Sequence, residues 1–394
     1  MNIGLFVDFQ KEKVGGGYVF EQNFIESLKH LHTIHKFFFF YFSNKRLFND
    51  THNITFVNIP KIKYFKLKDK IFKLHIYLYD IRLMYYYTPA FYPVDLPYIA
   101  TVWDLNHNDM PAFPEVSRHG GFEARQAHYN RILPKATRII VGNDTGKKEI
   151  CKYYPVDESK VKTIPMFTPQ DIFNLQPNEN ILKKYNLQKN SYIYYPAHFW
   201  AHKNHIRILK ALKELQRRNI YLRCVFSGMG SRLKYIKNKV NEYALENQII
   251  FAGFVTREEV CALYKNALAL TYASVFGPDN IPPLESLALG CPVIISNIKG
   301  HINQLGNHAI YFDTYNHIDL ADKIEYLLNN PLSQDKKIEG EKFAKQLSSD
   351  NYVKKALNVI EELSPILECW EYNNILKDLK INNKITNVFN IFFR

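Results

Sequence analysis

The sequence has few cysteines and no long apolar run. Its five cysteines are scattered, with no pair at CxxC spacing: Cys151, Cys224, Cys261, Cys291 and Cys369. This pattern excludes a disulfide framework and indicates a reducing compartment. No run of about 18 apolar residues is present, and no charged region with an apolar stretch precedes the strand predicted from Asn2 to Phe9. We therefore expect neither a membrane-spanning helix nor a signal peptide.

Two ligand-binding patterns are incomplete. Three consecutive glycines at 15–17 follow the first predicted strand, but the last glycine of a GxGxxG motif is missing and no acidic residue ends the second strand. This argues against a dinucleotide oxidoreductase. His198, His202 and His205 lack cysteine partners, and they lack a helical pair with an acid between its members. We expect no metal site.

The chain alternates short apolar strands with amphipathic helices, which indicates parallel sheets built from βαβ units. A length of 394 residues is enough for two such domains. We expect an α/β protein with Rossmann-like doubly wound domains at 1–170 and 171–364 and a tail at 365–394. A helix predicted at Lys70–Met84 belongs to the first domain. The tail is either a crossover helix or an amphipathic membrane contact.

Positive charge is in excess, and part of it is concentrated. The net charge is +13, and the segment 61–73 holds six lysines interleaved with aromatic and aliphatic residues. This mixture suits an anionic membrane surface, where each lysine contributes about 1 kcal/mol. It also occurs in proteins that bind single-stranded nucleic acid, and a basic helix face with its apolar side in the core is a third interpretation. We expect the membrane surface as a partner and no nucleic acid.

The segment from Phe276 to Ser296 carries the clearest functional signal. Its first residues are polar and turn-rich, and Pro282 and Pro283 suit the first turn of a helix, where a missing N–H costs nothing. We place Glu285 in the same turn. Open N–H groups at a helix start favour an anion, and a nearby carboxylate can accept hydrogen bonds from a ribose diol. The segment therefore indicates a nucleotide-sugar site.

This segment resembles the donor-binding motif of retaining GT-B glycosyltransferases, in particular the polysaccharide-assembly subset of glycosyltransferase family four with a Phe-Gly-Pro…Asn…Pro-Pro-Leu-Glu variant. The second glutamate of the family motif corresponds to Glu285. The first, which is credited with contacting the donor sugar, corresponds to Gly277 and is absent. Asp279 or the loop backbone is the candidate replacement. The resemblance implies the GT-B fold, with the two domains facing across a cleft.

A second segment, Tyr194–His205, agrees with this resemblance. Lys203 corresponds to the family's lysine, and His198 stands where the family has an arginine; these two residues hold the donor diphosphate in the family. A neutral histidine donates one hydrogen bond and carries no fixed charge. The resemblance therefore implies that phosphate binding depends on Lys203, with help from His198 or His202.

A third segment, Thr101–His107, looks like the family's His-Asp turn in the first domain. Trp103 takes the histidine position, Asp104 the aspartate position, and His107 is the nearest imidazole. The resemblance thus implies a catalytic set of Lys203, Asp104 and His107. It also implies a donor-binding set, which comprises Gly16, Gly17, His198, Lys203, Gly228, Phe254, Asn280, Ile281 and Glu285. In that set, Asn280 and Ile281 present backbone N–H groups to the diphosphate.

The resemblance implies a bacterial retaining glycosyltransferase that moves a sugar from a nucleoside diphosphate sugar to a lipid-linked or surface-polysaccharide acceptor, in capsule, O-antigen or lipopolysaccharide assembly. No DxD metal motif is evident, so we expect neither a metal nor another cofactor. The expected location is cytoplasmic and peripheral, on the inner face of the cytoplasmic membrane. Two alternatives remain: an inactive GT-B partner or scaffold module, motivated by the missing glutamate, and a nucleotide-sugar epimerase of the same fold.

Overall fold

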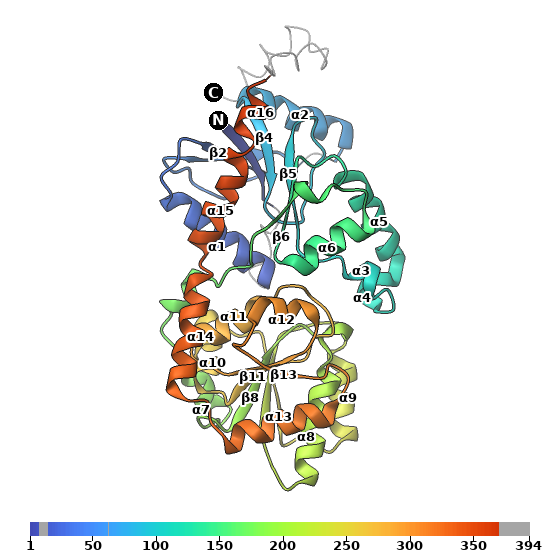
Figure 1. Ribbon diagram of the computed structural model, residues 1–394, viewed down its shortest axis with the longest axis vertical. Helices are drawn as coiled ribbons and strands as arrows, with labels where there is room; N and C mark the ends of the chain where they lie inside the picture. Colours follow the sequence, from blue (N-terminus) through green and yellow to red (C-terminus); the bar gives the residue numbers. More distant parts are fainter. Residues whose placement is uncertain (8–14, 62, 370–394) are drawn as a thin grey trace. The chain divides into compact units, whose positions relative to one another are not determined.

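The computed structural model describes residues 1–7, 15–61 and 63–369. The chain forms two β-sheets with helices between the strands (Figure 1). The expected architecture of two Rossmann-like parallel α/β units is confirmed. Most of the predicted tail, residues 370–394, lies outside the described residues, as does Ile62 of the basic segment.

The first sheet has seven strands in the order β3-β2-β1-β4-β5-β6-β7. They are β1 (Asn2–Phe6), β2 (Lys36–Phe42), β3 (Ile54–Ile59), β4 (Ile81–Tyr86), β5 (Tyr98–Val102), β6 (Arg138–Val141) and β7 (Val161–Thr163). The pairs among β1 to β5 are parallel. A parallel sheet covered on both faces favours continuous apolar strands, and β2, with the sequence KFFFFYF, has five consecutive buried residues.

The second sheet has six strands in the order β10-β9-β8-β11-β12-β13, and all five pairs are parallel. They are β8 (Tyr192–Pro196), β9 (Arg223–Ser227), β10 (Ile249–Gly253), β11 (Ala269–Tyr272), β12 (Val293–Ser296) and β13 (Ile310–Phe312). The direction of strand progression reverses between β8 and β11. Ligands of open α/β sheets bind beyond the carboxyl ends of the strands at such a switch point.

The helices connect these strands. The first group comprises α1 (Gly16–His30), α2 (Phe65–Leu78), α3 (Asn106–Asp109), α4 (Pro114–Ser117), α5 (Gly121–Ile132), α6 (Asp144–Tyr153), α7 (Asn180–Lys184) and α8 (His205–Arg217). The second comprises α9 (Leu233–Glu242), α10 (Arg257–Asn266), α11 (Ile281–Ala288), α12 (Lys299–Leu305), α13 (His317–Asn329), α14 (Gln334–Gln346), α15 (Ser349–Glu361) and α16 (Ser364–Leu367). Helix α13 packs against α8, and α14 packs against α11 (Figure 1).

The predicted helix at Lys70–Met84 is wrong in its second half. Helix α2 ends at Leu78, and Asp80 adopts a φ of 45°, which turns the backbone out of the helix. Residues 81–86 then form β4, which lies between β1 and β5 in the sheet. The run Ile-Arg-Leu-Met-Tyr-Tyr has the β-branched and aromatic content of a strand, and its burial inside the sheet outweighs the helical periodicity that the preceding residues set up.

Contacts divide the chain into two compact units. Unit 1 comprises residues 1–101, 135–140 and the described residues from 353 onward, whereas unit 2 comprises 102–134 and 141–352. The chain thus enters unit 1 for the last time within α15, ahead of the predicted tail. The predicted domain limits at 170 and 364 stay predictions. Within the described residues, no helix is long and apolar enough to cross a membrane.

Candidate active site

The switch point of the second sheet brings two loops together. The first follows β8 and ends in a short 3-10 helix at Ala201–Lys203, and the second follows β11 and leads into α11. The Lys203 Nζ donates to the Tyr272 hydroxyl at 2.9 Å, and this hydroxyl donates to the Asn280 Oδ1 at 2.7 Å. The ammonium group is thus connected to Asn280, the residue that immediately precedes α11. The lysine predicted from the sequence and the predicted helix start lie in one site.

The start of α11 is held by side chains from α12. The Asn280 N–H donates to the Gln304 Oε1 at 3.0 Å, and the Gln304 Nε2 donates back to the Asn280 carbonyl at 2.8 Å. The Asn280 side-chain nitrogen lies 3.1 Å from the His301 Nε2. The backbone N–H predicted to bind the diphosphate is therefore already bonded in this structure, and Asn280 serves to fix the loop. Ile281, the first residue of α11, is buried.

Glu285 lies in the second turn of α11 rather than the first, which corrects the prediction made from the proline pair. The two prolines do occupy the first turn. Glu285 is 5% exposed, and its Oε1 accepts a bond of 2.5 Å from the Arg257 guanidinium. Arg257 also donates to both oxygens of Asp171, at 2.8 and 3.0 Å. Burial alone lowers the pKa of Arg257, but these two carboxylates outweigh it and raise the pKa above its ordinary value.

His202 precedes Lys203 and is fixed by Glu115 of α4. The Glu115 carboxylate accepts from the His202 backbone N–H at 2.8 Å and from its Nδ1. The His202 ring stacks on Phe276 with centroids 4.1 Å apart. Burial lowers the pKa of His202. Burial raises the pKa of Glu115, but the hydrogen bonds from His202 prevail and lower it to about 2. A neutral histidine held by a carboxylate thus orients the turn that carries Lys203.

The loop after β9 packs tightly on the loop after β8. Gly228 has a φ of 135°, and a Cβ there would lie 2.5 Å from the Ala197 carbonyl oxygen. Only glycine fits this approach, so Gly228 shapes the site through its backbone. The His198 Nδ1 lies 2.9 Å from the carbonyl oxygen of Met229 in the same loop. Phe254 follows β10 with 58% of its surface exposed, and its contact with the donor stays a prediction.

Asp104 and His107 lie at the end of β5 and in α3. The Asp104 carboxylate accepts a bond of 2.8 Å from Arg125 of α5, and it remains partly exposed. His107 is 0% exposed, with its ring 5.7 Å from that of Tyr129. Burial, helped by the nearby Arg125 charge, lowers the pKa of His107 to about 4. In this conformation His107 is therefore a neutral packing residue, without the access to a substrate that its predicted catalytic role needs.

Asp279, the candidate replacement for the missing glutamate, is engaged by the segment after β6. Its Oδ1 accepts a bond of 3.1 Å from the Asn143 Nδ2, which also donates to the Pro278 carbonyl at 2.6 Å. A Cβ on Gly142 would lie 1.7 Å from the other carboxylate oxygen. Burial raises the pKa of Asp279 to about 7. Asp279 thus joins the β11 loop to the start of α6.

The remaining predictions concern unit 1 and metals. Gly16 and Gly17 open α1, after Gly15 with a φ of 105°. Residues 8–14, which precede them, lie outside the described residues, and the predicted contact of these glycines with a diphosphate stays a prediction. In the described part of the chain, no group of three or more His, Cys, Asp or Glu residues could hold a metal ion. Metal independence likewise stays a prediction.

Sequence reasoning missed four residues that fix the site. Tyr272 places a hydroxyl group at the end of a buried strand, and this pattern could have identified it as a candidate site residue. Arg257 was not among the predicted site residues. The sequence around Glu115 and Gln304 does not indicate their role, because their hydrogen-bond partners lie 87 and 24 residues away along the chain.

Comparison with known families identifies residues 177–345 as a match to the model "Glycosyl transferases group 1". This range holds the whole second sheet, with Lys203 and Glu285. The family resemblance drawn from the motifs is thereby supported at this level. The particular motif variant is not tested.

Curated relatives are similar over longer stretches. The uncharacterized glycosyltransferase MJ1607 of Methanocaldococcus jannaschii is 25% identical over 62% of this chain and 66% of its own length. O-antigen chain mannosyltransferase RfbU of Salmonella typhimurium is 27% identical over 47% of this chain and 51% of its own length. O-antigen chain mannosyltransferase B of Escherichia coli is 24% identical, over 73% and 76%. The chain thus spans between half and three quarters of these relatives.

Solved structures share the fold. Sucrose-phosphate synthase of Thermosynechococcus elongatus superposes with a TM-score of 0.73 at 17% identity, over 92% of this chain and 98% of that one. HepE of Anabaena, in complex with UDP and glucose, has a TM-score of 0.67 at 14% identity, over 92% and 100%. These likenesses confirm the GT-B class of two Rossmann-like units that the sequence predicts.

The buried pair of Glu285 and Arg257 yields a stability prediction. Replacing the arginine (Arg257→Gln) leaves Glu285 buried without its countercharge, so the free energy of unfolding falls by about 2–3 kcal/mol, less than for a fully buried pair because Arg257 is partly exposed. The control Arg217→Gln removes an exposed partner of Glu214. It lowers the free energy of unfolding by less than about 1 kcal/mol. Urea denaturation measures both. Equal effects would show that the pair contributes nothing beyond a surface ion pair.

Proposed function

We propose that the protein transfers a sugar from a nucleoside diphosphate sugar to a saccharide acceptor with retention of anomeric configuration. The match of residues 177–345 to the group 1 glycosyltransferases supports this proposal. The observation that carries this proposal is the Lys203 ammonium, hydrogen-bonded through Tyr272 to the start of α11 at the switch point of the sheet. A cation preorganised at this position matches the charge that a departing diphosphate develops.

Lys203 supplies the charge that the leaving group needs. When the bond between the anomeric carbon and the diphosphate oxygen breaks, negative charge accumulates on the β-phosphate. Within the described residues, no carboxylate lies within 4.0 Å of the Lys203 Nζ, so its charge is available to the ligand. We assign this role to Lys203 without a metal ion.

Glu285 is the proposed partner of the ribose. Its Oε1 is bonded to Arg257, whereas its Oε2 has no hydrogen-bond partner within the described residues. The Arg257 guanidinium supplies a countercharge to the buried carboxylate, and a carboxylate can accept hydrogen bonds from two vicinal hydroxyls. Arg257 is therefore a positioning residue for the donor, and Asp171 holds the arginine in turn.

Retention follows from attack on the face that the diphosphate leaves. In the proposed step, the bond from the anomeric carbon to the phosphate oxygen breaks as the bond to the acceptor oxygen forms. The acceptor's hydroxyl proton passes to the departing phosphate oxygen, so no protein nucleophile is needed. We assign Asp104, ion-paired with Arg125 and partly exposed, to the acceptor side. The buried His107 supports this turn through its packing against Phe122 and Tyr129.

The acceptor we propose is a lipid-linked or surface-polysaccharide saccharide, because two curated relatives act on O-antigen chains. Such an acceptor places the enzyme at the cytoplasmic face of a membrane. The start of α2 offers a surface for this contact: Tyr64 is 78% exposed and Leu67 49%, and Lys63 and Lys70 are exposed beside them.

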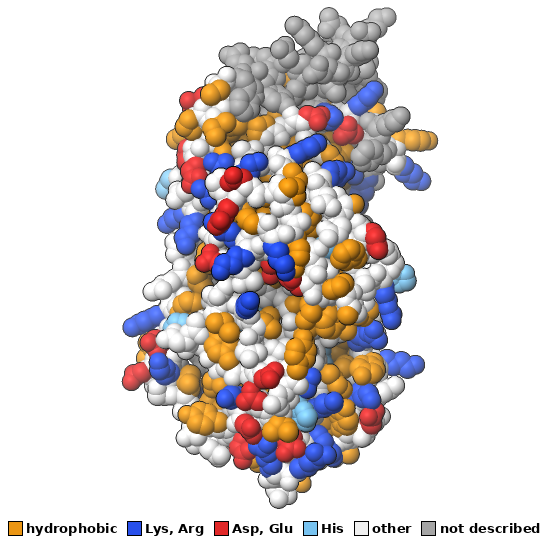
Figure 2. Space-filling model, turned by 45° about the vertical axis from the view of Figure 1, so that its right-hand side comes forward, with side chains coloured by type: hydrophobic (Ala, Val, Ile, Leu, Met, Phe, Trp, Pro, Cys, Tyr) orange, Lys and Arg blue, Asp and Glu red, His pale blue; other side chains and the backbone are white. Residues whose placement is uncertain are grey.

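Only part of the basic segment is available for a membrane. Lys68 lies over the Phe42 ring at 3.7 Å, and Lys73 is paired with Asp95 at 2.8 Å. On the described part of the face shown in Figure 2, lysine and arginine side chains lie at many separate places, with hydrophobic and uncharged surface between them. The membrane proposal therefore depends on the exposed residues at the start of α2 and not on net charge.

Removal of the lysine tests the transferase function. With Lys203→Ala, turnover of a panel of nucleoside diphosphate sugars falls about 100-fold or more, the size of effect seen when one preorganised group that stabilises transition-state charge is lost. The control Lys210→Ala changes an exposed lysine of α8 and leaves turnover unaltered. Release of nucleoside diphosphate in the presence of saccharide acceptors measures both. Product formed without acceptor would instead support the epimerase, and equal rates for the two variants would contradict the proposal.

Charge reversal on α2 tests the membrane contact. We expect Lys63→Glu with Lys70→Glu to weaken binding to vesicles containing anionic lipid at least about tenfold, since each lysine near the surface contributes about 1 kcal/mol. Lys234→Glu with Lys342→Glu makes the same charge change on exposed lysines of α9 and α14. Co-sedimentation with vesicles measures binding. If both double variants lose binding equally, the contact is not made by α2.

A further inference from the structure

Unit 2 contains a cavity with charged side chains in its lining, outside the loops that carry Lys203 and Glu285. It has a volume of about 550 Å³ and lies between α6 and α12, with α3 beside them. Its lining comprises Asp109, Thr145, Lys148, Glu149, Lys152, Lys299, Ile302 and Asn303. The volume is in the range of small-molecule sites, and three lysines against two acids leave the cavity positive.

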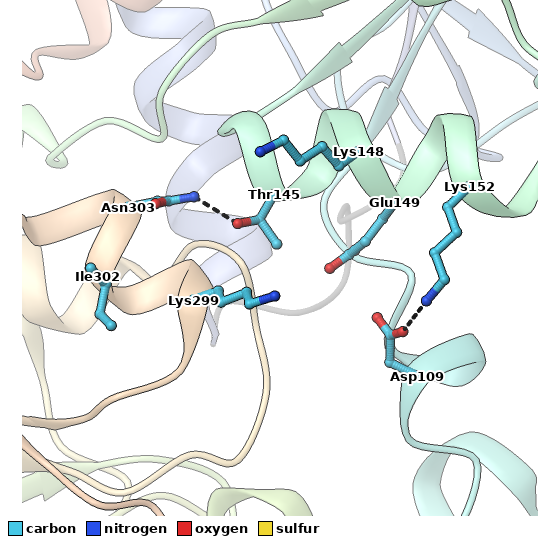
Figure 3. Close-up of a pocket in the computed structure, with 8 residues that line it drawn as sticks. All are labelled: Asp109, Thr145, Lys148, Glu149, Lys152, Lys299, Ile302 and Asn303. Carbon is cyan, nitrogen blue, oxygen red and sulfur yellow. Dashed lines mark hydrogen bonds and ion pairs between the residues drawn. The ribbon is translucent and has the colours of Figure 1, made fainter.

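Two of these lysines have no carboxylate partner among the residues that the structure describes. Lys152 has a carboxylate nearby, since its Nζ lies 3.5 Å from Asp109. Across residues 15–61 and 63–369, by contrast, neither Lys148 nor Lys299 has a carboxylate within 4.0 Å. Figure 3 shows Lys299 extending from α12 into the cavity toward Glu149 of α6. Uncompensated cations on facing helices attract an anionic ligand.

The two helices that form the cavity are held together by specific contacts. The Asn303 Nδ2 of α12 donates to the Thr145 hydroxyl of α6 at 2.7 Å (Figure 3). Asn143 caps the start of α6 by accepting from the Gly146 N–H at 3.1 Å, and its side-chain nitrogen donates to Asp279 in the loop before α11. Asn143 thus connects α6, one wall of the cavity, to the proposed donor loop.

We propose that this cavity binds an anionic group, phosphate or carboxylate, of the saccharide acceptor, with Lys148 and Lys299 as its ligands. This inference rests on the proposed function. It assigns the acceptor a negative charge close to the sugar that is extended. The charge has two chemical sources, the phosphate of a carrier or an acidic sugar, and the lysines on α6 and α12 serve either one.

Glu149 makes this site sensitive to pH. Its Oε2 is buried without a hydrogen-bond partner within the described residues, and burial, followed by the nearby acids, raises the pKa of Glu149 to about 7. The charged groups that face it come from its own helix and four other segments: Lys152, Asp109, Asp104, Asp279 and Lys299. Below pH 7 Glu149 is neutral and its protonated carboxyl can donate to an anion, whereas above pH 7 its charge repels the anion.

The lysines are tested with the donor site disabled. In a Lys203→Ala chain we measure binding of inorganic pyrophosphate and of D-glucuronate by calorimetry. We expect one of them to bind, and Lys148→Gln with Lys299→Gln to weaken that binding at least about tenfold, the loss of one or two charge-assisted hydrogen bonds. The control Lys147→Gln alters a lysine of the same helix that is paired with Glu158 at 3.2 Å. Circular dichroism verifies the fold of each variant.

The outcomes separate this inference from the proposed function. Pyrophosphate binding identifies a phosphate ligand, and glucuronate binding identifies a sugar-borne carboxylate. Binding of neither anion, or equal binding by the control and the double variant, overturns the anionic subsite. The transferase proposal is tested apart, by titrating the wild-type chain with nucleoside diphosphates. If the wild-type chain binds nucleotide but the double lysine variant binds the anion as well as its parent does, only the anionic subsite is rejected. If the double variant loses anion binding but the wild-type chain binds no nucleotide, only the donor site is rejected.

The pH dependence yields a separate prediction for Glu149→Gln. Glutamine is neutral at every pH, so the variant and the parent chain bind pyrophosphate alike at pH 6. At pH 8 the parent chain binds more weakly than the variant, because only the parent gains a negative charge in the cavity. The ionisation of pyrophosphate is common to both chains and cancels in the ratio of their affinities. A ratio that stays constant from pH 6 to 8 would exclude Glu149 from the site.

Discussion

The hydrogen bond from Lys203 to Tyr272, continued to Asn280, is the contact on which the candidate active site depends. It connects the loop after β8 to the loop after β11 at the one place in the second sheet where strand progression reverses. Without this hydrogen bond, nothing would fix the position of the ammonium group at the end of the flexible Lys203 side chain. With it, the cation is held at the start of α11, where a helix already favours negative charge.

The acids and bases around this contact fall into two groups. Two of the acids are compensated within the protein: Arg257 faces Glu285, and the neutral His202 donates to Glu115. Within the described residues, Lys203 at the donor loops and the two cavity lysines between α6 and α12 have no carboxylate partner. A buried charge is costly unless it is paired, so the compensated groups maintain the fold and orient the site. The uncompensated cations are accessible and are the ones available to anionic ligands.

The sequence predicted the architecture well because its signals are local. Apolar strands such as β2 and the proline pair at the start of α11 are visible in a few consecutive residues, and Lys203 was found by its motif. Contacts between distant residues were not predictable. Glu115 accepts a hydrogen bond from His202, which lies 87 residues away along the chain. Nothing near Glu115 in the sequence predicts this contact. Glu285 was placed one turn too early, and the turn at Asp80 that ends α2 was missed because a helical pattern continues beyond it.

The most direct test of this account is a crystal structure of the protein with a bound nucleoside diphosphate. The account predicts a β-phosphate oxygen within about 3 Å of the Lys203 Nζ, the usual length of such a bond, and the ribose hydroxyls on Glu285. A nucleotide bound elsewhere, with Lys203 still donating to Tyr272 and no phosphate near it, would contradict the central claim.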